Sequence, residues 1–573
     1  MSADTPPRAD DPGLVERQGC LVAEPSLPSR GVRHGQHAVP VPREVGHLMT
    51  LGSTKHVQEY PTSPHDPQLH VTHSGLVLLN GSRAYKFKRD VNLGFLDFST
   101  VEARRDALVR ELRLNQRLAP DVYLGLGSLE AGTAAQPEPC LVMRRLPDDR
   151  RLTAVLTARP TDPDRSLAVL DAVARQVARF HASARRGADV DRDGRRDALR
   201  HRWRDNLASV ESSTGTLLDH GVVQEVADLV DEYLTGREAL FDDRIAGGHI
   251  VDGHGDLIAQ DVFCLDDGPR ILDCLDFDDR LRHVDVLDDV AFLAMDVERL
   301  DSPALAEHLW TRYLELTGDP APPSLRHHYV AYRAFVRAKV GCLSGAAHDR
   351  HHGHLSSPEE HAVMALRHLR TARVRLVLCG GGPGTGKTTL SGALADRLGW
   401  VVVSSDRVRK ELAGVDPESD ASAPYGAGIY TPGWTERTYR EMVRRAELLL
   451  QRGESVVLDA TWSAAEHRLL ASHAAARCSV PLVELECRLT DSEVADRIAT
   501  RGVARTSGGT RTMSDADSAV ADRVRATSDR WHSAHGVDTS RPVATTVDEL
   551  VATFSWGSTV PARARPRPQM APD

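Results

Sequence analysis

The segment at residues 381–388 reads Gly381-Gly382-Pro383-Gly384-Thr385-Gly386-Lys387-Thr388 and follows the mostly apolar run Val374 to Cys379. An apolar strand, a glycine-rich turn and a helix start in this order are typical of a phosphate-binding P-loop. The glycines let successive backbone N–H groups point at phosphates, Lys387 brings a positive charge, and the Thr388 hydroxyl can bind Mg²⁺. The candidate nucleotide-binding residues are therefore Gly381, Gly382, Pro383, Gly384, Thr385, Gly386, Lys387, Thr388 and Thr389.

The residues after this loop alternate between helix and strand patterns. Leu390, Leu394 and Leu398 recur with the period of a helix, and Gly399 is placed to end it. This alternation predicts a doubly wound parallel sheet with helices on both faces. The expected strands are Val374 to Cys379, Trp400 to Ser404, Ser455 to Leu458, Leu482 to Leu489 and Val543 to Thr546.

Two acidic residues follow expected strands. Asp406 comes after the second strand, at the sheet edge where ligands bind in such folds, and could orient or deprotonate an acceptor hydroxyl. Arg409, one turn later, could hold an anionic group of the acceptor. The alternative is that Asp406 only caps its helix. Asp459 ends the third strand, Val456-Val457-Leu458-Asp459, in the form of a Walker B aspartate that holds Mg²⁺.

Arginines recur four residues apart on the expected helix that begins near Asp491. Arg497 and Arg501 could close over the phosphates and neutralise charge in the transition state. A solvated helix face is the equally simple alternative for either arginine.

These motifs together resemble the small P-loop kinases related to gluconate kinase, antibiotic-phosphorylating kinases and the kinase half of polynucleotide kinases. The similarity covers residues 372 to about 550 and includes Ser405-Asp406-Arg407-Val408-Arg409-Lys410 and Val457-Leu458-Asp459-Ala460-Thr461. It implies that Asp406 activates the acceptor hydroxyl and that Arg497 and Arg501 belong to a lid. The stretch Asp416 to Trp434, where acceptor specificity would lie, matches no pattern.

The N-terminal half carries a second set of motifs. His254-Gly255-Asp256-Leu257 is followed 17 residues after Asp256 by Asp273, an order in which one aspartate addresses the acceptor and the other Mg²⁺. Upstream, the expected strand around Lys86 could deliver this lysine to the α and β phosphates. Ser99 and Glu102 have the spacing of a capping box, and the helix they begin places Glu111 as a partner for Lys86.

Residues 70 to about 340 resemble the aminoglycoside phosphotransferase-like kinases, and specifically the group in which such a domain precedes a P-loop kinase. The similarity rests on the motifs above and on Met143-Arg144-Arg145-Leu146-Pro147, Phe180-His181, and Asp285 with Asp289. It implies a bilobal protein-kinase-like fold, with Asp256 as the catalytic aspartate and Asp273, with Asp276, as metal ligands.

One position departs from this family pattern. Five residues after the catalytic aspartate the family has an asparagine that helps to hold the metal, and this chain has Asp261. A carboxylate also binds Mg²⁺, so Asp261 is a candidate metal ligand, but it adds negative charge beside ATP. No glycine-rich phosphate loop is evident from His73 to Gly81. The domain is thus either an active kinase or a regulatory nucleotide-binding domain that keeps the fold.

Length and composition limit the class of protein. The 573 residues exceed one compact core, and 41% hydrophobic with 27% charged residues fits globular domains without a membrane span. A net charge of −10 argues against a nucleic acid partner. The N-terminus lacks the pattern of a secretory signal and the cysteines form no CxxC pair, which favours the cytoplasm. The expected parts are a disordered tail at 1–55, a kinase-like domain at 56–368, a P-loop domain at 369–556 and a tail at 557–573.

The sequence therefore predicts an ATP- and Mg²⁺-dependent kinase that phosphorylates a hydroxyl of a small molecule, mainly through the P-loop domain. Two alternatives stay open. One is a regulatory protein in which ATP occupancy switches a surface without a metabolite acceptor. The other is a toxin-like kinase that acts on a nucleotide sugar. The acceptor and the oligomeric state are not readable from the residues.

Overall fold

The computed structural model describes residues 67–71, 75–92, 97–129, 136–158, 162–300, 302–344, 357–416, 426–506 and 518–556. The two expected tails lie outside these ranges, as do residues 72–74 and residues 417–425 of the stretch expected to set acceptor specificity. Among the described residues, no helix is both long and apolar enough to cross a membrane.

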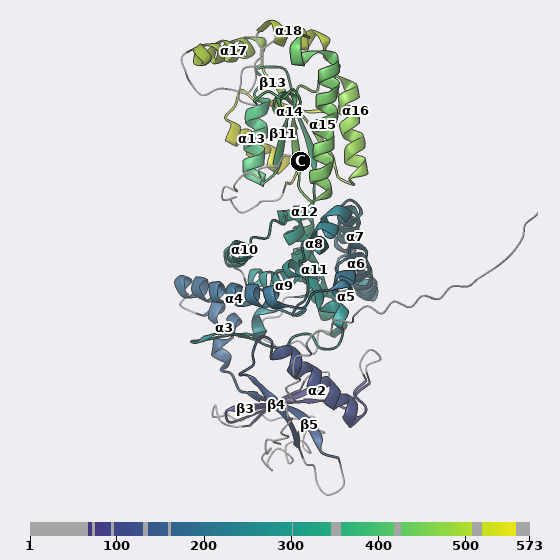
Figure 1. Cartoon of the computed structure of the whole chain (residues 1–573), viewed down its shortest axis with the longest axis vertical. Coiled ribbons are helices and arrows are strands. Elements are labelled where there is room, and N and C mark those ends of the chain that lie inside the picture. The colour runs from purple at the N-terminus through teal and green to yellow at the C-terminus, as the bar shows by residue number, and fades with distance from the viewer. Residues whose placement is uncertain are drawn as a thin grey trace, which may run out of the picture.

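The N-terminal part is an antiparallel sheet of order β1-β2-β3-β5-β4, seen at the bottom of Figure 1. Helix α2 packs on β4 and β5, and its N-cap is Thr100, whose hydroxyl accepts a hydrogen bond from the Ala103 N–H. The predicted cap at Ser99 was therefore wrong by one residue, because Thr100 satisfies the same first-turn donors. The elements are β1 (Gln68–Val71), β2 (Gly75–Asn80), β3 (Arg83–Lys88), α2 (Val101–Asn115), β4 (Tyr123–Leu129) and β5 (Glu138–Arg144).

A helical region follows the sheet and forms the middle of the molecule in Figure 1. Two small antiparallel pairs, β6 with β9 and β7 with β8, lie at its junction with the N-terminal sheet. The helices are α3 (Leu152–Thr157), α4 (Pro163–Ser183), α5 (Ala188–Asp193), α6 (Arg196–Val210), α7 (His220–Thr235), α8 (Glu238–Ala246), α9 (Val286–Arg299), α10 (Pro303–Thr317), α11 (Pro323–Ser344) and α12 (Pro358–Ala372). The strands are β6 (Ile250–Asp252), β7 (Val262–Leu265), β8 (Gly268–Ile271) and β9 (His283–Asp285).

Helix α9 forms the centre of this region. Every residue from Val286 to Val297 is buried, which makes α9 a core helix without a solvent face. Helices α10 and α11 pack on it, and α12 packs back on α11 and on α7. Because α12 runs straight on into the next strand, it connects the helical region to the P-loop sheet.

The C-terminal part is a parallel sheet of order β11-β12-β10-β13-β14. Figure 1 shows α13 on one side of the strands and α15 with α16 on the other, as expected for a doubly wound fold. The strands are β10 (Leu376–Gly380), β11 (Val401–Ser404), β12 (Val456–Asp459), β13 (Leu482–Arg488) and β14 (His535–Asp538). The helices are α13 (Lys387–Leu398), α14 (Ser405–Leu412), α15 (Pro432–Gln451), α16 (Ala465–Arg477), α17 (Asp491–Thr506), α18 (Ser518–Thr527) and α19 (Val543–Thr553).

Four of the five predicted strands of this sheet are confirmed, and the fifth was wrong. Residues Val543–Thr553 form α19, and the fifth strand is β14, which pairs with Leu485 to Arg488 of β13. Val547 and Leu550 are buried at helical spacing, and Pro542 stands at the N-cap. The apolar period of 3–4 residues therefore outweighed the β-branched composition that suggested a strand.

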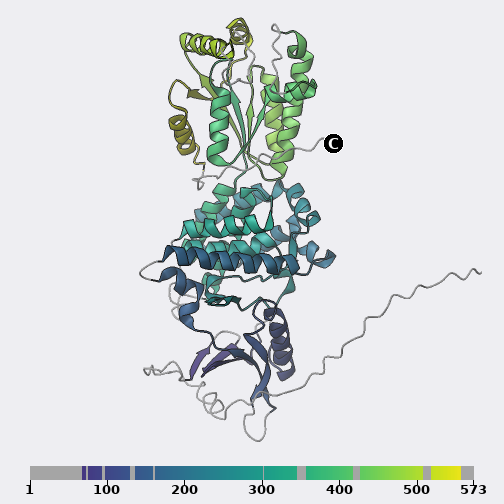
Figure 2. The ribbon, with the colours of Figure 1, turned by 60° about the vertical axis from the view of Figure 1, so that its left-hand side comes forward.

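The two halves share a continuous apolar core and several direct contacts. Arg237 Nη1 donates to the carbonyl oxygen of Cys478 at 3.0 Å, and Ser324 Oγ donates to that of Gly453 at 2.7 Å. Arg373 binds Glu232 at 2.7 Å. Strand β10 begins four residues after α12, so the carboxyl ends of the parallel strands point away from the helical region, toward α17 and α18 (Figures 1 and 2).

Candidate functional site

The P-loop connects β10 to α13 in a conformation that requires its glycines. Gly381, Gly384 and Gly386 have φ of 135°, 89° and 87°, in the region that side chains disfavour. A Cβ on Gly381 would lie 2.9 Å from the carbonyl oxygen of Cys487. Helix α13 then begins at Lys387, which leaves the unpaired N–H groups of its first turn at the loop.

Asp459 at the end of β12 is buried beside the start of α13. Burial raises its pKa, against the opposing effects of the Lys387 charge and a hydrogen bond from Thr388. Only 2% of Asp459 is exposed, and its Oδ1 has no hydrogen-bond partner within the described part of the chain. A buried carboxylate oxygen without a donor, next to a threonine hydroxyl, fits a site for Mg²⁺.

Asp406 lies at the same sheet edge. It is the second residue of α14, and the strand before it places Ser404 opposite Asp459 in the β11–β12 register. The negative charge of Asp406 contributes to the raised pKa of Asp459. The structure thus brings Asp406, Asp459, Lys387 and Thr388 together at the carboxyl ends of β11 and β12.

Arg409, predicted to hold an anionic group of the acceptor, is buried and contacts other residues of the chain. Its Nη1 donates to the carbonyl oxygen of Ile429 at 3.0 Å and to Thr435 Oγ1 at 3.2 Å, and its guanidinium lies over the ring of Tyr430. Its Nε has no partner among the residues described. Arg409 therefore connects α14 to the segment that begins α15.

Arg497 of α17 reaches the P-loop. A Cβ on Gly386 would lie 3.0 Å from Arg497 Nη1, and its Nη2 donates to the carbonyl oxygen of Thr539 at 2.7 Å. Arg501 follows one turn later on α17, but its side chain is outside the described part of the chain. The structure brings Arg497 to the phosphate-binding loop.

Two threonines support the P-loop: Thr539, which the sequence reasoning missed, and Thr461, which ends the motif Val457 to Thr461. Thr539 Oγ1 donates to the carbonyl oxygen of Thr385 at 2.6 Å. The carbonyl oxygen of Thr461 accepts from the Gly381 N–H at 3.2 Å, and its hydroxyl binds the Tyr439 hydroxyl at 3.0 Å. No local sequence signal marks Thr539, because it becomes a neighbour only when β14 adds to the sheet.

The second candidate site lies between the N-terminal sheet and the helical region. Lys86 Nζ of β3 binds Glu111 Oε1 of α2 at 2.7 Å, as the sequence predicted, and Asp273 Oδ1 at 2.7 Å. Lys88 Nζ binds Glu111 Oε2 at 2.8 Å and Asp276 Oδ2 at 2.9 Å. Sequence reasoning missed Lys88, although the period of a strand places it on the same face as Lys86.

Three carboxylates converge here. Burial raises the pKa of Asp256 to about 6, and burial together with the charges of Asp273 and Asp256 raises that of Asp261 well above its usual value. The charge of Lys86 lowers the pKa of Asp273. Mutually repelling carboxylates fit a divalent cation, which Asp261 and Asp273 could hold while Asp276 binds Lys88.

The loop that carries Asp256 is held from behind by Asp289 of α9. This fully buried carboxylate accepts from the N–H groups of His254 at 2.6 Å and Gly255 at 2.8 Å, and it contacts His181 Nε2 at 3.3 Å. Burial opposes ionisation of Asp289, yet the hydrogen bond from His181 keeps its pKa below the ordinary value. The loop is therefore positioned by a fixed negative charge.

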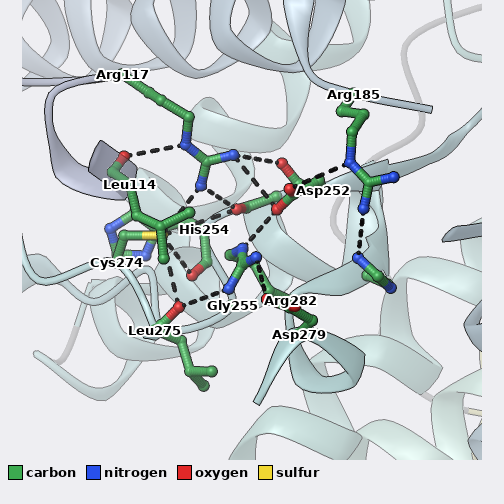
Figure 3. A network of polar contacts seen from close by, with 12 residues as sticks. Leu114, Arg117, Arg185, Asp252, His254, Gly255, Cys274, Leu275, Asp279 and Arg282 are labelled. Atoms are coloured by element: carbon green, nitrogen blue, oxygen red, sulfur yellow. Dashed lines mark hydrogen bonds and ion pairs between the residues drawn. The ribbon is translucent and has the colours of Figure 1, made fainter. Parts of the chain in front are cut away.

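Two arginines connect this loop to the one that carries Asp273 (Figure 3). Arg117 donates to the carbonyl oxygens of Asp252 at 2.9 Å and Gly253 at 2.8 Å and to Cys274 Sγ at 3.1 Å. Arg282 binds the Asp252 carboxylate and donates to the carbonyl oxygen of Leu275 at 3.0 Å. Both loops are thus fixed to each other before any ligand binds.

Comparison with known proteins assigns the C-terminal half first. Residues 376–530 match the family described as AAA domain, which supports a nucleotide-binding P-loop domain. Uncharacterized protein Rv2004c of Mycobacterium tuberculosis and uncharacterized protein Mb2027c of Mycobacterium bovis are each 39% identical to this chain over 496 residues. The alignment covers 85% of this chain and 95% of each relative. The chain belongs to the family of these two proteins.

Two solved structures are similar to parts of this family member. A choline/ethanolamine kinase family protein from Mesorhizobium loti is 14% identical, covers 57% of this chain and 94% of its own, and has a TM-score of 0.33. The Mycobacterium tuberculosis APS kinase CysC in complex with AMPPNP and APS is 19% identical, covers 32% and 98%, and has a TM-score of 0.24. These similarities identify no acceptor for the chain.

Proposed function

We propose that the chain is an ATP-dependent phosphotransferase with two sites. Residues 369–556 form a P-loop kinase domain that transfers the γ-phosphate of ATP to a hydroxyl of a small molecule. Residues 56–368 form an aminoglycoside phosphotransferase-like kinase domain with a site of its own. The observation that carries the proposal is the buried, partnerless Oδ1 of Asp459 beside Lys387 and Thr388, with Asp406 at the same sheet edge.

The P-loop site contains the parts that phosphoryl transfer needs. The backbone N–H groups of the loop and Lys387 bind the β and γ phosphates, and Thr388 with Asp459 would hold Mg²⁺, which neutralises phosphate charge when bound. Asp406 accepts the proton of the acceptor hydroxyl while the oxygen of that hydroxyl forms a bond to the γ-phosphorus. The bond between that phosphorus and the bridging oxygen breaks, and ADP leaves. Arg497 compensates the charge that develops on the phosphoryl oxygens.

The N-terminal site supports a second kinase for a separate reason. A lysine on the third strand paired with a buried glutamate of the following helix is the arrangement that positions α and β phosphates in protein-kinase-like folds, and Lys86 with Glu111 has it. Asp256 occupies the catalytic position of a loop that Asp289 and Arg117 already hold in place. A purely regulatory domain would not need this preorganisation of the acceptor-activating aspartate.

One labelling experiment tests both sites. The full-length protein is incubated with γ-labelled ATP and a metabolite extract, in parallel with Lys387→Ala, Asp406→Asn and Asp256→Ala variants and an Asp396→Asn control, which changes an exposed residue of α13. We expect one labelled small molecule that disappears with Lys387→Ala and Asp406→Asn, a second that disappears only with Asp256→Ala, and both in the control. ATP consumption without any labelled acceptor would instead favour the regulatory alternative. Equal product from Lys387→Ala and wild type would remove the P-loop from the mechanism.

A further inference from the structure

Asp256 has different surroundings on its two sides. Lys86, Glu111 and Asp273, on the nucleotide side, come from β3, α2 and the loop after β8. On its other side, Arg333 and Arg337 of α11 bring positive charge toward Asp256 from the helical region. In the proposed reaction the acceptor must approach Asp256 from this helical side, because the phosphates occupy the lysine side.

One face of α11 runs from the loop of Asp256 to the start of α12. Arg333 Nη1 donates to the carbonyl oxygen of Gly255, the residue before Asp256, at 2.9 Å. Two turns later, a Cβ on Gly341 would lie 2.9 Å from Cγ of Pro358, the first residue of α12. Residues four apart share a helix face, so Arg337 lies midway between these two contacts.

The charges of Arg333 and Arg337 are compensated differently. Arg333 forms an ion pair with the buried Asp288, with Nε–Oδ1 at 2.7 Å. Arg337 is partly buried and makes no hydrogen bond or ion pair with any residue that the structure describes. Burial raises the pKa of Asp256, and the positive charge of Arg337 is the largest of the opposing effects, so the two groups are near each other.

A second unsatisfied group lies on α12. His361 is 4% exposed, and its Nδ1 donates to the carbonyl oxygen of Ser357 at 3.2 Å, which leaves Nε2 as an acceptor. This Nε2 is buried and has no partner in the described ranges. Burial, with the nearby charge of Arg337, lowers the pKa of His361 to about 4, so the ring is neutral at pH 7. The side chain of Arg337 thus lies near Asp256 on one side and near the unpaired acceptor of His361 on the other.

We propose that Arg337 binds an acidic group, a phosphate or a carboxylate, of the molecule that the N-terminal site phosphorylates. The acceptor is then an anionic polyol, such as a sugar phosphate or a hydroxy acid, whose hydroxyl groups also complement His361. This inference rests on the proposed function of the N-terminal domain and narrows its acceptor class. A cationic acceptor such as an aminoglycoside or choline would instead meet the like charge of Arg337 at the catalytic aspartate.

Binding is tested in the full-length Lys387→Ala protein, in which the P-loop no longer competes for phosphate. Inorganic phosphate and acetate, as probes of the two acidic groups, are titrated by calorimetry into this protein and into versions that also carry Arg337→Gln, Arg337→Lys or Arg367→Gln. Loss of one charge-assisted hydrogen bond weakens binding by about tenfold. We expect this loss with Arg337→Gln, partial recovery with Arg337→Lys, and no change with Arg367→Gln, which replaces an exposed arginine of α12. Equal binding of both probes by the parent protein and the Arg337→Gln variant, or no binding by either, overturns the proposal.

Transfer is tested separately with γ-labelled ATP and glycerol 3-phosphate, glycerate, glycerol or choline as acceptors. We expect label on an anionic acceptor, and about a tenfold rise of its KM in Arg337→Gln with a smaller change in kcat. Preferential labelling of choline or glycerol overturns the proposal. If Arg337 only tunes Asp256, the substitution shifts the pH profile of kcat for every acceptor and leaves KM unchanged, which also overturns it. If no acceptor is labelled but phosphate binding depends on Arg337, the anion site stands and the kinase function of this domain fails.

Discussion

Glu111 is shared by two lysines of one strand: its Oε1 lies 2.7 Å from Lys86 Nζ and its Oε2 lies 2.8 Å from Lys88 Nζ. Side-chain exposure is 21% for Lys86, 7% for Lys88 and 1% for Glu111. Lys86 is therefore the more accessible lysine, and in the proposed function it contacts ATP, whereas Lys88 is enclosed with the glutamate. The two lysines should have separable roles, one in nucleotide binding and one in stability.

Substitution of each lysine by methionine tests this separation. Lys88→Met removes one ion-pair partner of the buried Glu111 carboxylate, and we expect the free energy of unfolding to fall by about 3 kcal/mol. Lys86→Met leaves Glu111 paired with Lys88, so the loss of stability should be smaller, while ATP binding to the N-terminal site is abolished. Denaturation curves and nucleotide titrations in the Lys387→Ala background measure the two effects. Equal loss of stability in both variants would contradict the separation.

Asp406→Asn tests the acceptor-activating role in the P-loop domain. The amide keeps the shape of the side chain but cannot accept the proton, so we expect kcat to fall about 10² to 10⁴-fold with little change in the affinity for ATP. Asp396→Asn on the exposed side of α13 is the matched control and should leave kcat unchanged. Steady-state kinetics with the labelled acceptor provide the measurement. Loss of ATP binding with unchanged turnover at saturation would contradict the assignment.

His328 on α11 should make the protein acid-sensitive. The ring is fully buried, accepts a hydrogen bond from Trp203 Nε1 at 3.2 Å and stacks on Tyr233. Burial lowers its pKa from 6.5 to about 3. The folded state therefore binds this proton less readily than the unfolded state. The contribution to stability is complete above about pH 6.5 and is lost as the pH falls toward 3, by about 2–3 kcal/mol at pH 4.5.

His328→Gln removes this titration and keeps an acceptor for Trp203. We expect the variant to be less stable than wild type at pH 7.5, since the stacked ring is lost, but to lose less of its stability between pH 7.5 and pH 4.5. Urea denaturation followed by tryptophan fluorescence at the two pH values measures how much stability wild type and the variant each lose. An equal loss of stability in wild type and the variant would show that another group causes the acid sensitivity.

The two halves are in close contact at Gly236. A Cβ there would lie 2.0 Å from the carbonyl oxygen of Cys478, so Gly236→Ala forces the backbones apart. Overpacking of this kind costs about 1–3 kcal/mol, and we expect a lower melting temperature. Gly392→Ala on α13 is the control. It meets no atom within 4 Å and replaces a helix glycine, so it should raise stability by up to about 1 kcal/mol.

The sequence was informative where a local pattern was sufficient. The P-loop could be predicted from its glycine pattern. Four strands could be predicted because continuous apolar runs between turns are typical of buried parallel strands: Leu376–Gly380, Val401–Ser404, Val456–Asp459 and Leu482–Arg488. The pairing of Lys86 with Glu111 could be anticipated for a different reason, since it rested on a family resemblance and the order of motifs.

The remainder depended on contacts between distant residues. His535–Asp538 contains one valine and no strand pattern, and it is a strand only because Leu485–Arg488 offers it an edge. Thr539 supports the P-loop across 154 residues of sequence. Arg337 is one of many arginines in the chain. It stands out only because it lies one turn after Arg333, which contacts Gly255.

The orientation of the parallel strands determines how the two proposed sites face relative to each other. Because the strands run outward from α12, their carboxyl ends open away from the N-terminal sheet, with the helical region between the two sheets. In the proposed function, the two sites therefore bind their ligands at opposite ends of the helical region. Joining the domains in one polypeptide therefore keeps the two sites at a fixed ratio of one to one.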